Sequence, residues 1–84
     1  MYKIEYTKKS MKFLYKYDRI FKQKLEQKIF EFLEWKKADI KRLQWYNQEI
    51  YRLRIGKYRV IFEKQDDKLI ILVLDIWSRW DIYK

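Results

Sequence analysis

The chain has 84 residues, of which 49% are hydrophobic, 20% aromatic and 39% charged, and its formal net charge is +9. This length allows one domain, residues 1–84, and the mixture of apolar and charged side chains excludes a disordered chain. Because the sequence contains neither cysteine nor histidine, we expect no disulfide, no transition-metal site and no cofactor.

The N-terminal residues predict a strand followed by a short helix. Residues 2–6 alternate between apolar and polar side chains and are rich in strand-forming residues. Thr7 can then cap a helix over residues 8–17, in which Met11, Leu14 and Tyr15 are expected to face the core. Asp18 can cap the next helix, so the two helices are expected to form a hairpin.

The second helix is predicted over residues 19–37 from a regular apolar stripe. Four apolar side chains recur at every fourth position, and three more lie on the flanking turns: Phe21, Leu25, Ile29 and Leu33, with Ile20, Phe30 and Phe32. Phe30 and Trp35 are expected in the core, and lysines occupy much of the opposite, solvated side.

The remaining sequence predicts three strands in an antiparallel meander. After a polar connection at residues 38–42, strands are expected at 46–55, 58–64 and 68–76. Gly56 and Lys57 make the first tight turn, and residues 64–67 make the second. The predicted fold class is therefore α+β, in the order β-α-α-β-β-β, with a helical hairpin packed on a small, mainly antiparallel sheet.

Arginines are concentrated in the predicted strands. If Tyr51, Leu53 and Ile55 enter the core, then Arg52 and Arg54 project together from the other face, about 7 Å apart. That separation approaches the spacing of neighbouring phosphates along one nucleic-acid strand. Arg59 lies on the adjacent strand and Arg79 follows the third, so the sheet can gather all four arginines on one patch.

The same arginines also have a simpler interpretation. They can be solvated charges that discourage strand pairing at an edge, or partners of nearby acids such as Glu49, Glu63 and Asp75. The composition alone supports only the binding of a polyanion.

Aromatic side chains divide into core residues and candidate base contacts. Tyr58 and Phe62 share one strand face and are expected in the core. Trp77, Trp80 and Tyr83 surround Arg79, and Trp80 is our candidate for stacking on a base.

The segments IYRLRIGKYRVIFE and LIILVLDIWSRWDIYK resemble the RelE/ParE superfamily of toxins from type II toxin-antitoxin systems. Relatives carry a strand Y-[RK]-[LI]-[RK], a glycine turn, YRV[IL][YF], and a closing element with arginine and tyrosine. The resemblance spans essentially the whole chain and implies the RelE-like fold. The RelE-like branch carries four basic residues and one tyrosine in its site. This chain has a suitable residue at all five positions, so that branch is favoured.

The resemblance implies a ribosome-dependent, metal-independent mRNA endoribonuclease that inhibits translation and arrests growth. Its reaction is attack of a ribose 2′-hydroxyl on the adjacent phosphodiester. The implied catalytic residues are Arg52, Arg54, Arg59, Arg79 and Tyr83. Relatives often carry lysine at the first two positions, and arginine is a poor base, so Tyr83 is the candidate for proton transfer.

The resemblance and the charge together imply the partners. We expect a cognate, acidic antitoxin, and the ribosome with mRNA; operator DNA is expected only through the antitoxin complex. Further RNA contacts are assigned to Lys57, Trp80, Lys8, Lys9, Lys12, Lys16, Lys22, Lys24 and Lys28. With no apolar leader and no bilayer-length apolar run, we expect a cytoplasmic protein without membrane contact. The alternatives are a ParE-like inhibitor of DNA gyrase, and a basic RNA-binding module or inactivated toxin.

Overall fold

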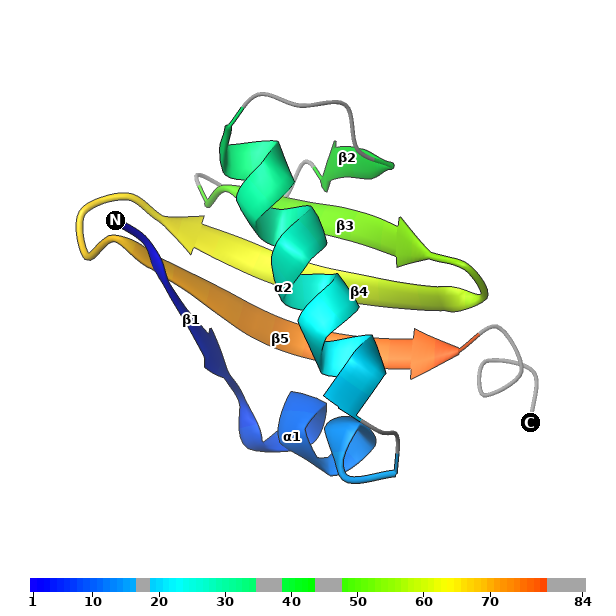
Figure 1. Ribbon diagram of the computed structural model, residues 1–84. Coiled ribbons are helices and arrows are strands. Elements are labelled where there is room, and N and C mark those ends of the chain that lie inside the picture. Colours follow the sequence, from blue (N-terminus) through cyan, green and yellow to red (C-terminus); the bar gives the residue numbers. More distant parts are fainter. Residues whose placement is uncertain (17–18, 35–38, 44–47, 79–84) are drawn as a thin grey trace.

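The computed structural model describes residues 1–16, 19–34, 39–43 and 48–78, which form two helices and a five-stranded mixed sheet. In chain order the elements are β1 (Lys3–Tyr6), α1 (Lys8–Leu14), α2 (Arg19–Leu33), β2 (Ile40–Leu43), β3 (Ile50–Ile55), β4 (Tyr58–Gln65) and β5 (Ile70–Ser78) (Figure 1). The predicted α+β class, with a helical hairpin on a mainly antiparallel sheet, is confirmed. Neither helix of these residues is long and apolar enough to cross a membrane.

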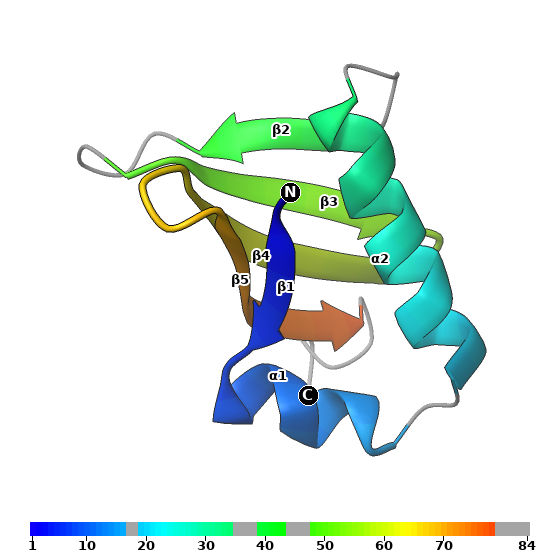
Figure 2. The ribbon, with the colours of Figure 1, turned by 60° about the vertical axis from the view of Figure 1, so that its left-hand side comes forward.

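The sheet has the strand order β1-β5-β4-β3-β2. β1 runs parallel to β5, and every other neighbouring pair is antiparallel. Helix α2 lies across one face of this sheet (Figure 1), and the turned view shows no helix of the described residues on the opposite face (Figure 2). Within the described ranges, one face of β3 and β4 therefore has no helical cover.

Strand β2 was not predicted, and it corrects the connection expected at residues 38–42. Residues 40–43 pair antiparallel with β3, from Ile40 opposite Leu53 to Leu43 opposite Ile50. The strand is short and lies at the sheet edge. Its two central residues are both basic, and this hides the usual alternation of apolar and polar side chains. The same charges discourage pairing with another chain. The neighbouring strand accordingly begins at Ile50 rather than at residue 46, and β5 extends to Ser78.

Thr7 caps α1 as predicted and also joins this helix to the sheet. Its Oγ1 accepts a hydrogen bond from the Ser10 backbone N–H at 3.2 Å and donates to the Leu74 carbonyl at 2.8 Å. The fully buried Ser10 hydroxyl lies 3.0 Å from the Val73 carbonyl oxygen, to which it donates. These bonds fix the start of α1 against β5.

The core fills the space between α2 and the sheet. Phe21, Leu25 and Ile29 of the predicted stripe are buried, with Leu25 and Ile29 fully inaccessible. They pack with side chains from β3, β4 and β5, of which the fully buried ones are Leu53, Val60, Phe62, Ile71 and Val73. Tyr58 packs against this cluster, and its ring centroid lies 4.8 Å from that of Phe21.

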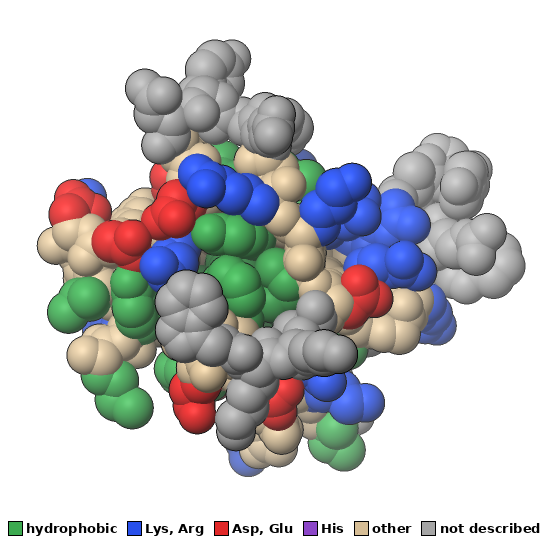
Figure 3. Space-filling model, turned by 90° about the horizontal axis from the view of Figure 1, so that it is seen from above, with side chains coloured by type: hydrophobic (Ala, Val, Ile, Leu, Met, Phe, Trp, Pro, Cys, Tyr) green, Lys and Arg blue, Asp and Glu red, His purple; other side chains and the backbone are tan. Residues whose placement is uncertain are grey.

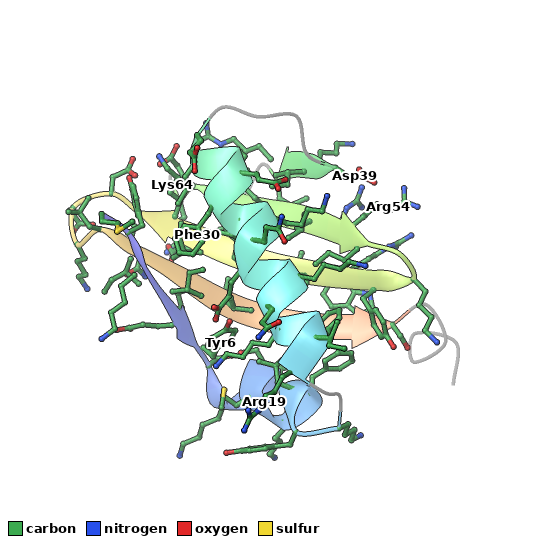
Figure 4. All side chains as sticks on the ribbon, viewed as in Figure 1. Tyr6, Arg19, Phe30, Asp39, Arg54 and Lys64 are labelled. Atoms are coloured by element: carbon green, nitrogen blue, oxygen red, sulfur yellow. The ribbon has the colours of Figure 1, made fainter. Side chains whose placement is uncertain are left out.

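Two apolar residues predicted in the core, and a third from the turns flanking the α2 stripe, lie outside the core. Tyr15 is 81% exposed although its backbone is still helical, because the buried side of α1 is formed by Ser10, Phe13 and Leu14 and Tyr15 lies off that side. Ile20, at the start of α2, is 68% exposed. Phe30 is half-buried and lies outside the core cluster (Figure 4). The prediction for Trp35 lies outside the described residues.

The β3–β4 hairpin turns at Gly56 and Lys57, as predicted. Gly56 has a φ of +57°, a left-handed conformation that costs glycine little. This two-residue turn sets Ile55 opposite Tyr58 and fixes the register of both strands. The second turn comes slightly later than predicted, at residues 66–69, because β4 continues to Gln65.

Tyr6 on β1 donates a hydrogen bond to the Glu26 carboxylate on α2, and Lys22 Nζ lies 5.4 Å from the centre of the Tyr6 ring. Burial, and then the hydrogen bond and charge of Glu26, raise the pKa of Tyr6 far above its ordinary value near 10. The folded state therefore holds this proton more tightly than the unfolded state. The stabilisation is complete below about pH 10 and declines as the pH rises further.

Tyr6→Phe is expected to lower the free energy of unfolding by about 1–2 kcal/mol at pH 7, because the Glu26 carboxylate loses its donor. The variant should also lose less stability than the wild type between pH 8 and 10.5. Urea unfolding at these pH values measures both effects, and Tyr15→Phe, at an exposed position, serves as the control. An identical pH dependence in wild type and Tyr6→Phe would contradict the assignment.

Candidate nucleic-acid interface

Strand alternation places the arginines on the side of the sheet away from α2. Tyr51, Leu53 and Ile55 belong to the core or pack against it, as predicted. Arg52 and Arg54 alternate with them and therefore point to the opposite side. We call this side the open face; its members are Lys41, Arg52, Arg54, Arg59, Ile61 and Trp77.

The strand register brings residues from distant parts of the chain together on the open face. Arg54 lies directly opposite Arg59 across the β3–β4 pair, and Arg59 lies opposite Trp77 across the β4–β5 pair. Arg52 stands between Lys41 of β2 and Ile61 of β4. Four basic side chains from three adjacent strands therefore share one face, in two neighbouring rows.

Arg54 and Arg59 form an unfavourable pair unless an anion lies between them. Like charges directly opposite on antiparallel strands are destabilising. The Arg54 Nε lies 3.8 Å from Oδ2 of Asp39, and both side chains are at least half exposed, so this ion pair is weak (Figure 4). A phosphate group that accepts hydrogen bonds from both guanidiniums would remove the repulsion.

The acids proposed as alternative partners of the arginines have other partners. Glu49 Oε2 lies 4.0 Å from Lys64 Nζ, and Glu63 accepts a hydrogen bond from Gln65. Asp75 Oδ2 lies 3.2 Å from Lys9 Nζ, and the other carboxylate oxygen accepts the Ile76 N–H. Among the described residues, Asp39 is the acid that pairs with an arginine of the open face.

Basic side chains also gather at one end of the molecule. Figure 3 shows lysine and arginine side chains concentrated on the right-hand side, toward the end of the sheet that carries the β3–β4 turn. A pocket of about 630 Å³ lies near this turn, and Lys16, Lys24 and Lys57 contribute to its lining. Positive potential therefore extends from the open face around the hairpin end.

Most of the lysines assigned to RNA lie on the helices rather than on the open face. Lys8, Lys9 and Lys12 belong to α1, and Lys16 follows it; Lys22, Lys24 and Lys28 belong to α2, which covers the other side of the sheet. Lys9 is paired with Asp75, and Lys57 Nζ lies 5.5 Å from the centre of the Tyr58 ring. The α2 lysines therefore cannot touch the same nucleotide as the arginines of the open face.

Part of the predicted site lies outside the described residues: Arg79, Trp80 and Tyr83 follow the end of β5 at Ser78. Two residues of the open face were missed. Lys41 was assigned to a connection because the two adjacent basic residues of IKRL hide any alternation, and Trp77 was not chosen over Trp80 because the predicted strand stopped too early. Among the described residues, no three Asp, Glu, His or Cys side chains converge as metal ligands.

A family model described as ParE toxin of type II toxin-antitoxin system, parDE, matches residues 4–83. This match spans nearly the whole chain. No curated protein matches the sequence.

Several solved structures have the same fold. RelE in the RelE-RelB complex of Pyrococcus horikoshii OT3 is 24% identical, with a TM-score of 0.72 over 93% of this chain and 94% of that one. The RelB-RelE antitoxin-toxin complex of Methanococcus jannaschii gives 25% identity and a TM-score of 0.68, covering 94% of each chain. The isolated E. coli RelE toxin is 19% identical, with a TM-score of 0.70 over 99% of this chain and 92% of that one. These likenesses confirm the RelE-like architecture expected from the sequence.

Proposed function

The chain belongs to the ParE toxin family of type II toxin-antitoxin systems, within the RelE/ParE superfamily, and we propose that it acts as a ribosome-dependent mRNA endoribonuclease. The observation that carries this proposal is the pairing of Arg54 with Arg59 on the open face, with Arg52 two residues along the same strand. Like charges facing each other cost stability, and a bound phosphodiester accounts for their retention.

In the proposed reaction, the ribose 2′-oxygen forms a bond to the adjacent phosphorus while the bond to the 5′-oxygen breaks. Arg54 and Arg59 hold the scissile phosphate and stabilise the charge that grows on its non-bridging oxygens. Preorganised donors of this kind contribute about 3–4 kcal/mol each to the transition state. The reaction leaves a cyclic phosphate and a free 5′-hydroxyl, and needs no metal.

Proton transfer is assigned to residues beyond β5. Arginine is a poor base, so Arg52, Arg54 and Arg59 are not assigned the role of accepting the 2′-hydroxyl proton. We propose that Tyr83 takes this role, because neighbouring guanidiniums would favour its phenolate form, and that Arg79 stands beside the leaving oxygen. Trp80 is proposed to stack on a base.

The proposed partner that restrains the toxin is a cognate antitoxin. Two of the similar structures are complexes with RelB, described as an antitoxin in the Methanococcus jannaschii case. A net charge of +9 favours an acidic partner and also attracts ribosomal RNA. We propose that operator DNA is contacted only through the antitoxin complex, and that the lysines of α1 and α2 contact ribosomal RNA. The proposed location is the cytoplasm, where these targets lie.

Inhibition of DNA gyrase is the second candidate, because the matching family model describes ParE toxins rather than RelE toxins.

The nuclease and the gyrase inhibitor differ in the products that they leave in cells. We expect that brief induction in growing cells produces new mRNA 5′ ends within translated codons, in frame with the ribosomal A site. Sequencing of 5′-hydroxyl RNA ends measures this, with gyrase-linked DNA breaks mapped in parallel. DNA breaks without new mRNA ends would refute the nuclease and support the gyrase inhibitor.

A further inference from the structure

An acidic residue lies beside the arginine pair of the open face. Asp39 immediately precedes β2 and continues the register of this strand, so that it lies opposite Arg54. The Arg54 backbone N–H donates a hydrogen bond to the Asp39 carbonyl oxygen at 3.0 Å, which fixes the two residues side by side. Asp39, Arg54 and Arg59 therefore form one row across the sheet, with Arg54 in the middle.

The Asp39 carboxylate lies at one edge of the Arg54 guanidinium. Its Oδ2 is 3.8 Å from the Nε of Arg54, and Figure 4 shows the two side chains next to each other. A guanidinium presents its N–H donors in a planar fork, so a carboxylate beside Nε leaves the terminal nitrogens available for a second anion. The Arg54 side chain is 50% exposed, so an anion from solution can reach these nitrogens.

The charges on the two sides of Arg54 have opposite signs. Asp39 attracts the guanidinium toward the edge of the sheet, and Arg59 repels it from the other side. Both forces draw Arg54 toward Asp39 and keep its side chain apart from that of Arg59. The gap between two guanidiniums held apart in this way can admit one phosphate group.

The charge of Asp39 also restricts where an anion can bind. On the Asp39 side of Arg54 a phosphate would meet a carboxylate, whereas on the Arg59 side it would meet a second guanidinium. The row of charges therefore directs a phosphate into the gap between the two arginines. An exposed ion pair adds little to stability, so stability does not explain why an acid lies at this position.

We propose that Asp39 is a positioning residue for the nuclease reaction and that it orients Arg54 so that the scissile phosphate binds between Arg54 and Arg59. The inference rests on the proposed function and deepens it, because it adds an acid to a site otherwise built from cations. Asp39 does not touch the mRNA and acts through Arg54. Since a carboxylate near a phosphate also weakens phosphate binding, loss of Asp39 should strengthen binding and yet slow cleavage.

Cleavage of an A-site codon on purified ribosomes tests the positioning role. In single-turnover assays at saturating toxin, Asp39→Ala should cleave about tenfold more slowly than the wild type, because Arg54 is no longer held in the productive orientation. The toxin concentration that gives half of the maximal rate should not rise. Asp39→Glu, which restores the carboxylate, should recover most of the rate. Asp67→Ala removes the same charge from the exposed β4–β5 turn and should cleave like the wild type.

Binding of a short RNA with 2′-O-methyl groups gives a readout that does not depend on cleavage. The Arg54 Nε–H resonance of the purified chain is identified by its disappearance from the ¹⁵N spectrum of Arg54→Lys. The RNA should shift this resonance, and Asp39→Ala should bind the RNA about threefold more tightly than the wild type at low salt. Asp67→Ala is again the matched control and should bind like the wild type.

The two assays separate failure of this inference from failure of the nuclease. If the wild type cleaves and Asp39→Ala cleaves equally fast, the nuclease stands and Asp39 has no positioning role. Faster cleavage by Asp39→Ala would also overturn the inference, because the ion pair would then be an obstacle that the mRNA must break. If the wild type does not cleave at all, the nuclease is refuted, and equal, weaker or absent RNA binding by Asp39→Ala would refute the role of Asp39 as well.

Discussion

Replacing both Arg54 and Arg59 with alanine is expected to abolish the growth arrest caused by the wild-type toxin. Each guanidinium is proposed to contribute about 3 kcal/mol to the transition state, so loss of either should slow cleavage at least 100-fold, and the double variant should be inactive in cells. The fold should survive, because Arg54 is exposed and the change removes a like-charge pair from the sheet. Growth after induction and mRNA 5′-end sequencing measure the two effects.

The matched control removes the same charge from the other end of the sheet. Lys3 and Lys68 are exposed residues near the β4–β5 turn, so Lys3→Ala with Lys68→Ala lowers the net charge equally without touching the open face. This variant should still arrest growth. If both double variants lose toxicity equally, general charge rather than a phosphate site carries the function.

Phe62→Ala is expected to lower the free energy of unfolding by about 3–5 kcal/mol. Phe62 is fully buried on β4, and its ring centroid lies 5.5 Å from that of Tyr51 and 5.9 Å from that of Phe32. A domain of this size has a stability of about 4–12 kcal/mol, so the variant should lose a large part of it. Urea unfolding followed by circular dichroism measures the change.

Phe30→Ala is the matched control, since the same side chain is removed from a half-buried position outside the core cluster. This variant should lower the free energy of unfolding by less than half as much as Phe62→Ala. Similar losses for the two variants would contradict the placement of α2 on the sheet.

Local sequence patterns predicted the part of the site that lies around the hairpin. Alternation in β3 separated Arg52 and Arg54 from the core residues between them. The two-residue turn at Gly56 and Lys57 then determined that Arg54 faces Arg59, because register follows from turn length. These features depend on neighbours in the sequence, and sequence reasoning recovers such features well.

The packing of α1 against β5 depends on features that local patterns do not contain. The register shifts between Ile61 and Phe62, so that Ile61 faces Asp75 whereas Phe62 faces Val73. Such an irregularity re-aims side chains and has no clear sequence signature here. It leaves Leu74 without a counterpart in the register, and the carbonyls of Val73 and Leu74 instead bond Ser10 and Thr7.

The edge position of β2 explains why this strand was not predicted from the sequence. β2 has four residues, and its two central side chains, Lys41 and Arg42, are both basic. A short charged segment has little intrinsic preference for a strand, and only pairing with β3 makes it one. Lys41 therefore joins the open face through tertiary structure rather than through its own sequence.

The central proposal is that Arg54 and Arg59 bind one phosphodiester of the mRNA on the open face. The structure of the toxin bound to a ribosome tests it, with an A-site codon whose 2′-hydroxyls are methylated so that cleavage cannot occur. We expect a phosphate within hydrogen-bonding distance of both guanidiniums. Message bound along α2, or an open face that stays empty while the toxin occupies the ribosome, would contradict the proposal.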